Sequence, residues 1–196
     1  MAQTEQKNQN VKKQFEELQS LLERAMALQT SMVLFEWDDE TLAPKGATEH
    51  TARVIGSLSE QYQEILASMR FKELLDACQK AEKENAGVFD EVQSAILREA
   101  AEEQERLSCI PPEEYRAYAE LTARATGIWT RAREKNDFAS FAPVLKEIIS
   151  YQKKFAAYRA KPGQKLYDVM LDTYEKGFNM EMLDPFFELM KGKIVP

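Results

Sequence analysis

Apolar residues recur every three or four positions along almost the whole chain, the spacing that places them on one side of an α-helix. The first such run consists of Val11, Phe15, Leu18, Leu22, Ala25 and Met32. Only seven glycines and seven prolines interrupt the 196 residues, too few for the many turns of a β-sandwich or barrel. The pattern therefore predicts an all-α fold, a single domain of about seven or eight helices that spans residues 1–196.

Prolines and short polar residues mark the expected helix ends. Pro44 ends the first helix, because proline donates no backbone hydrogen bond and disfavours helix in the residue before it. We expect Thr48 to cap the second helix and Ser140 to cap the sixth, since a side-chain oxygen there accepts from free amides. The last helix has two candidate caps, Asn179 and Asp184.

Two counts exclude whole classes of chemistry. The nearest pair of glycines, Gly46 and Gly56, lies ten positions apart, so no glycine-rich loop can bring backbone amides together around a phosphate. His50 is the only histidine, which rules out a His-Glu-x-x-His zinc helix and the paired Glu-x-x-His motifs of a di-iron bundle. A Ser-His-Asp or Cys-His site needs only one histidine, but no Gly-x-Ser-x-Gly elbow occurs and both cysteines lie in helical patterns, where buried thiols are usually inert. Sequence alone therefore predicts no catalytic residue and no metal ligand in this chain, and His50 is expected on a helix surface or at a cap.

Charge and cysteine content indicate the setting of the protein. Lys and Arg total 26 against 33 Asp and Glu, a net charge of −7, which argues against nucleic acid or an anionic membrane as a partner. The two cysteines, Cys78 and Cys109, make a disulfide framework implausible, so a reducing compartment is expected. The polar start of the chain is unlike a secretory signal, and no apolar run is long enough to span a bilayer. We therefore expect a cytoplasmic protein.

The densest polar cluster is Glu36-Trp37-Asp38-Asp39-Glu40, near the predicted end of the first helix. Carboxylates are unfavourable at a helix C-terminus, so a cation such as Arg53 or a capping role is expected to compensate them. The favoured interpretation is a polar helix end with a buried Trp37 whose indole N–H is paired. Acid–base catalysis would need carboxylates from distant helices, which this spacing does not show.

Aromatic residues are frequent in the last third of the chain. Those at helical spacing are Tyr167, Tyr174, Phe178, Phe186 and Phe187. They are expected to pack in the core rather than to line a groove, and the apolar residues of the last helix are expected to point inward as well.

Three blocks of sequence carry recognisable motifs: Glu36 to Ala47, Trp129 to Leu145 and Tyr167 to Gly177. Together they resemble the carboxypeptidase Taq family of zinc metallocarboxypeptidases. The first, from Glu36 to Ala47, is similar to the family's Glu-Trp-Asp-x-x-Thr…Pro-x-Gly-Ala signature. The second runs from Trp129 to Leu145, and the third, from Tyr167 to Gly177, is similar to Tyr-Asp-x-x-Leu-Asp-x-Tyr-Glu-x-Gly. The residues that carry this resemblance are Glu36, Trp37, Asp38, Thr41, Pro44, Trp129, Asn136, Asp137, Phe138, Tyr167, Asp168, Tyr174 and Glu175.

The resemblance implies an N-terminal helical portion, which in the family forms part of the wall of a deep substrate groove. Family members are much longer, and their His-Glu-x-x-His helix and further glutamate ligand have no counterpart in this sequence. The chain is therefore expected to be incomplete at its C-terminus, with zinc or another divalent metal, and peptide substrates, belonging to the full-length enzyme. The apolar ending Ile194-Val195-Pro196 agrees with a cut chain.

Two hypotheses follow from the resemblance. In the first, the chain is the groove-forming part of an enzyme that releases C-terminal amino acids, inactive until joined by the catalytic part. In the second, it is a helical interaction protein that descends from the family. Under the first hypothesis Phe186, Phe187, Met190, Ile194 and Val195 expose apolar surface, which a second copy is expected to cover in a homodimer.

Overall fold

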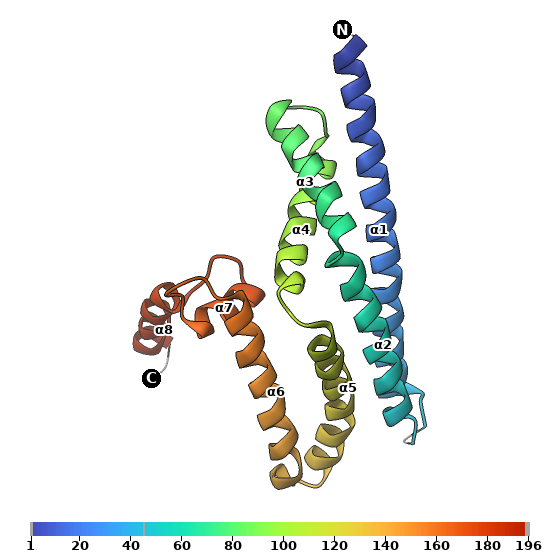
Figure 1. The fold of residues 1–196 in the computed structure, drawn as a ribbon. Helices are drawn as coiled ribbons and strands as arrows, with labels where there is room; N and C mark the ends of the chain where they lie inside the picture. The colour runs from blue at the N-terminus through green and yellow to red at the C-terminus, as the bar shows by residue number, and fades with distance from the viewer. Residues whose placement is uncertain (1, 45, 195–196) are drawn as a thin grey trace. The chain divides into compact units, whose positions relative to one another are not determined.

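The computed structural model describes residues 2–44 and 46–194, and in that part of the chain it contains eight α-helices and no strand (Figure 1). The predicted all-α fold is confirmed. The chain divides into two compact units, Met1–Phe141 (unit 1) and Ala142–Pro196 (unit 2), which we describe separately. The single domain over residues 1–196 stays a prediction. No helix of the described residues is both long and apolar enough to cross a lipid bilayer.

Unit 1 is built on a long first helix, α1 (Ala2–Thr41). The helices α2 (Thr48–Leu66) and α3 (Met69–Glu84) pack against α1, whereas α4 (Glu91–Ser108) packs against α2 and α3. The fifth helix, α5 (Pro112–Glu134), packs against α2 (Figure 1). The predicted stripe on the first helix supplies much of the core, because Val11, Phe15, Leu18 and Ala25 are all buried.

The core of unit 1 lies where α1, α2, α3 and α4 meet. Its least exposed large side chains are Leu18, Leu66, Phe71, Leu74, Leu97 and Leu107. Phe15 and Phe89 bring their rings to 5.0 Å between centroids, which joins the start of α1 to the turn before α4. Because this core covers the first half of α1, the second half keeps Met26, Val33 and Leu34 exposed.

Unit 2 consists of most of α6 (Phe138–Arg159), the short α7 (Leu166–Tyr174) and α8 (Met180–Ile194). The buried side chains among its described residues, 142–194, are Phe155, Ala156 and Val169. No described residue of α8 is buried. This unit therefore has little core of its own.

Helix caps differ in part from the sequence-based expectations. Ala47, not Thr48, precedes the first residue of α2, and no side chain caps that end. Asp137 replaces Ser140 as the cap of α6, because its Oδ1 accepts from the Ser140 amide at 3.2 Å. At α8 the Asn179 Oδ1 accepts from the Met182 amide at 3.0 Å, which settles the choice against Asp184.

Candidate functional site

The first signature block closes the end of α1 and shapes the turn into α2. Thr41 donates its hydroxyl hydrogen to the Trp37 carbonyl at 2.6 Å, and the amides of Leu42 and Ala43 donate to the Asp38 carbonyl. The Pro44 carbonyl then accepts from the Ala47 amide at 2.8 Å. These contacts satisfy carbonyl groups that a helix end leaves free.

The predicted burial of Trp37 is wrong. Its side chain is 56% exposed. The buried stripe of α1 continues to Met32, whose sulfur accepts from the Ser59 hydroxyl of α2. Trp37 lies five positions beyond Met32, roughly 140° further around the helix, and therefore points away from α2.

The acidic residues beside Trp37 have no ion pair with Arg53 among the described residues, so the predicted compensation by Arg53 is wrong. Partial burial, together with the neighbouring Glu40 carboxylate, raises the pKa of Glu36 above its ordinary value. Among the described residues no cation pairs with the cluster, which lies at a helix end where the backbone dipole is also unfavourable for carboxylates.

The second signature block lies at the same end of unit 1 as the first. The helices α2 and α5 run antiparallel, since Thr48 lies against Gly127 whereas Glu60 pairs with Arg116 at 2.8 Å. The start of α2 and the end of α5 are therefore neighbours, as Figure 1 shows at the foot of the unit. Both blocks therefore lie at this end of the unit.

At this end of unit 1, α5 exposes a tryptophan. Trp129 is 44% exposed, and the Arg133 guanidinium lies 5.2 Å from its ring centroid. Asn136 adopts a positive φ of 51°, which lets the chain leave α5, and Asp137 then caps α6. Phe138, the first residue of α6, is 67% exposed.

The third block lies in unit 2, where its acidic residues organise the turn between α7 and α8. Asp168 Oδ1 accepts from the Met180 amide at 2.9 Å, and Asp172 Oδ1 accepts from the Gly177 amide at 2.8 Å. The expectation that the aromatic set packs in the core is wrong: each of these rings is partly or mostly exposed, from 36% for Phe178 to 85% for Tyr174. Glu175 is exposed as well.

Sequence reasoning missed two buried polar features of unit 1. Gln63 is fully buried, and its Nε2 donates to the carbonyls of Leu107 at 3.1 Å and Ile110 at 2.7 Å. Tyr62 donates to Glu103, which also accepts from Arg106, and burial followed by the Glu103 charge raises the pKa of Tyr62. Helical spacing places Tyr62 on the inward side of α2, but it gives no signal that Glu103 is its partner.

The residues present do not suit a metal ion. Among residues 2–44 and 46–194, no three His, Cys, Asp or Glu side chains are grouped so that they could hold one. His50 lies on the exposed side of α2. The signature residues thus shape three turns and expose aromatic rings, an arrangement suited to forming a surface.

A comparison with known protein families assigns the chain to a family. Residues 17–196 match the family model described as the carboxypeptidase Taq (M32) metallopeptidases. The chain belongs to the M32 metallopeptidase family. All of the signature residues named above lie within the matched range.

Curated relatives in the M32 family are much longer than this chain. Carboxypeptidase 1 of Bacillus subtilis is 34% identical over 176 residues, which cover 90% of this chain and 34% of that protein. Thermostable carboxypeptidase 1 of Pyrococcus furiosus is 30% identical over 173 residues, 88% of this chain and 34% of that protein. The chain therefore spans about a third of the length of the curated relatives it matches.

Solved M32 structures share the helical arrangement. The crystal structure of BsuCP gives a TM-score of 0.88 at 32% identity, covering 94% of this chain and 36% of that one. Metallocarboxypeptidase 1 of Trypanosoma cruzi gives a TM-score of 0.73 at 25% identity, covering 93% and 36%. The roles of the individual signature residues in the family stay predictions.

Proposed function

We propose that this chain is the N-terminal, groove-forming portion of an M32 metallocarboxypeptidase that releases C-terminal amino acids from peptides. The observation that carries the proposal is the family match over residues 17–196 in a chain that spans only a third of its relatives. In this account the catalytic zinc, or another divalent metal, is bound by the two thirds of the enzyme that the chain does not match. Cys78 and Cys109 form no disulfide, which supports a cytoplasmic setting.

The chain contributes surface to the enzyme, and it is inactive alone. Trp37, Trp129 and Phe138 expose large apolar area near the end of unit 1 at which the first two signature blocks lie. Exposed aromatic rings offer contact area to a peptide or to the rest of the protein at small conformational cost. The acidic cluster beside Trp37 would make this part of a groove wall negative.

Metal analysis and a peptidase assay on the isolated chain test the proposal. We expect no stoichiometric zinc after dialysis at neutral pH and no release of C-terminal residues from peptides. One tightly held zinc per chain, lost in His50→Ala, together with peptide hydrolysis, would place the active site in this chain and contradict the proposal.

The alternative is a non-catalytic helical interaction protein derived from the family, and the exposed apolar surface is compatible with it. The nucleotide sequence after the codon for Pro196 separates the two. A reading frame that continues into His-Glu-x-x-His supports the enzyme, whereas a native stop codon supports the interaction protein. The homodimer stays a prediction, which sedimentation of the isolated chain tests.

A further inference from the structure

Unit 2 buries too little to hold its last two helices in place. The helix α7 is nine residues long and buries only Val169, and α8 is fifteen residues long and buries none of those described. Helices this short gain most of their stability from packing rather than from their own hydrogen bonds. Packing for α8 must therefore come from outside unit 2.

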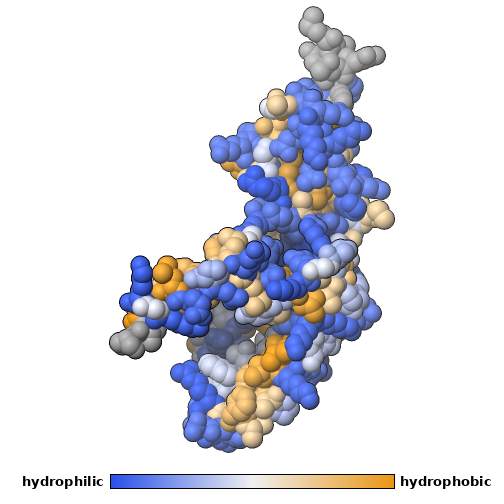
Figure 2. Space-filling view, turned by 90° about the vertical axis from the view of Figure 1, so that its left-hand side faces the viewer, coloured by the Kyte–Doolittle hydropathy of each residue, from blue (hydrophilic) through white to orange (hydrophobic). Residues whose placement is uncertain are grey.

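One side of α8 is shaped for contact with another helix. Met182, Phe186, Leu189 and Met190 follow the spacing i, i+4, i+7 and i+8, so they form a single stripe, which we call the α8 apolar face. Each of the four side chains is exposed, from 37% at Met190 to 55% at Leu189. On the face of the molecule that Figure 2 presents, apolar side chains lie beside strongly hydrophilic ones.

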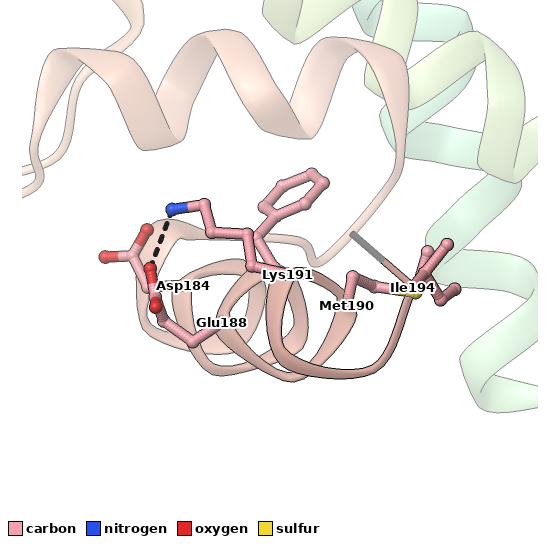
Figure 3. A pocket seen from close by; sticks show the side chains of 6 residues that line it. Asp184, Glu188, Met190, Lys191 and Ile194 are labelled. Carbon is pink, nitrogen blue, oxygen red and sulfur yellow. Dashed lines mark hydrogen bonds and ion pairs between the residues drawn. The ribbon is translucent and has the colours of Figure 1, made fainter. Parts of the chain in front are cut away.

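Next to the α8 apolar face lies an open groove of about 620 Å³, lined by Asp184, Phe187, Glu188, Met190, Lys191 and Ile194. Figure 3 shows the carboxylates of Asp184 and Glu188 together at one side, with the Lys191 ammonium 2.8 Å from Glu188. Met190 and Ile194 point to the other side. The charged residues therefore border the apolar surface and leave it open to a partner.

The comparisons indicate what that partner is. The family match runs to residue 196 and therefore includes α8, so this helix belongs to the family fold. In the relatives the matched third is part of a chain about three times as long. Contiguous apolar patches seldom stay uncovered in folded proteins. The unmatched two thirds of such a chain are therefore the occupant that the comparisons favour.

We propose that the α8 apolar face docks an amphipathic helix from the two thirds of the M32 chain that this chain does not match. The inference rests on the proposed function and adds the surface through which the two parts join. Acidic Glu181, Asp184 and Glu188 precede basic Lys191 and Lys193 along α8. The partner helix should therefore carry basic residues beside the N-terminal end of α8 and acidic residues beside its C-terminal end.

A chimera tests the docking surface. This chain is joined to the part of Bacillus subtilis carboxypeptidase 1 that it does not match, and Phe186→Ser with Met190→Ser is introduced into the chimera and into the isolated chain. We expect the double substitution to lower the unfolding temperature of the chimera by at least ~5 °C, because it removes two covered apolar side chains. The isolated chain, at concentrations where it sediments as a monomer, should shift by no more than ~1 °C, since both side chains are exposed there.

Glu181→Ser is the matched control, because Glu181 lies on the charged side of the same helix and should leave both proteins unchanged. If the chimera is active and the double substitution does not change its unfolding temperature, the docking proposal is wrong. The proposed function is not affected by that result. A chimera without peptidase activity contradicts the proposed function itself. A dimeric chimera that the double substitution converts into a monomer assigns the face to a second copy, and that result also overturns the docking proposal.

Discussion

Gln63 joins α2 to the break between α4 and α5 with a single side chain. Its amide donates to two carbonyls, of Leu107 and Ile110, while its own Oε1 has no partner among the described residues. We expect Gln63→Leu to lower the free energy of unfolding by about 2 kcal/mol, because two acceptors lose their donor. Gln61→Leu, at an exposed position of the same helix, is the control and should change it by less than about 0.5 kcal/mol in urea titrations. Equal effects of the two substitutions would contradict the role given to Gln63.

Gly56 allows α2 and α5 to approach closely. A Cβ at this position would lie only 3.0 Å or less from three atoms of the Glu120 side chain. Glu120 itself is held by Arg116, at 3.0 Å from Arg116 Nε to its Oε1. We expect Gly56→Ala to destabilise the chain by about 1 kcal/mol or more, despite the better helix propensity of alanine.

The same substitution should become neutral or stabilising in a Glu120→Ala background, where the clash is gone. Gly192→Ala is the control, because nothing lies within 4 Å of its added Cβ. The coupling is measured from the denaturant midpoints of the parent chain, the two single variants Gly56→Ala and Glu120→Ala, and the double variant. A Gly56→Ala effect that is the same in both backgrounds would show that Glu120 is not the obstacle.

Glu36 gives stability a pH dependence of known sign. The pKa of Glu36 is raised in the folded chain, which means that folding favours the protonated carboxyl. The stability that this protonation contributes is fully present below the unfolded-state pKa, and it is lost as pH rises through the folded-state pKa. Glu36→Gln should therefore raise the urea midpoint at pH 7, and the gain should disappear as pH falls below the ordinary value of 4.5. Glu16→Gln, on the same helix, serves as the control. A gain that persists at pH 3 would assign the effect to something other than ionisation.

At the scale of helices, the second half of α1 is the clearest departure from an ordinary amphipathic helix. It has α2 on one side, and it exposes Met26, Val33, Leu34 and Trp37 elsewhere. Trp37→Ala should cost less than about 1 kcal/mol in the isolated chain, because most of the ring is already in solvent. Phe71→Ala, at a fully buried site, should cost about 3–5 kcal/mol. A comparable loss for both in chemical denaturation would mean that Trp37 is covered in solution.

Helical spacing was enough to predict the all-α fold and the buried stripe from Val11 to Ala25, since that stripe depends only on residue order. Helical spacing could not predict which apolar stripes would stay exposed, because the burial of a stripe depends on whether another helix packs against it. Trp37 and Tyr174 continue apolar patterns, yet no helix of the described residues packs over them. Gln63 shows the reverse: a polar residue is buried because carbonyls from a distant turn meet it.

The choice of helix caps shows a similar limit. Both Asp137 and Ser140 are good capping residues, and their order along the chain does not say which one begins α6. The structure selects Asp137 because its carboxylate reaches the Ser140 amide.

The signature residues were recognised by resemblance alone, and their geometry adds that the polar members build turns whereas the aromatic members face outward.

At the scale of the molecule, the two units differ in how far they are completed. Unit 1 buries a continuous core among its first four helices, whereas the described part of unit 2 buries only Phe155, Ala156 and Val169. The proposed packing of unit 2 against the rest of a longer M32 chain accounts for this contrast, because unit 2 would complete its packing there.

Amide hydrogen exchange of the isolated chain tests this account most directly. Amides of α4 around Leu97 should exchange only on global unfolding, since this residue lies in the core of unit 1. Amides of α7 and α8 should exchange at least ~100-fold faster, because little packing opposes the opening of these helices. Protection of α8 equal to that of α4 in the monomeric chain would show that unit 2 is complete by itself, and it would contradict the account.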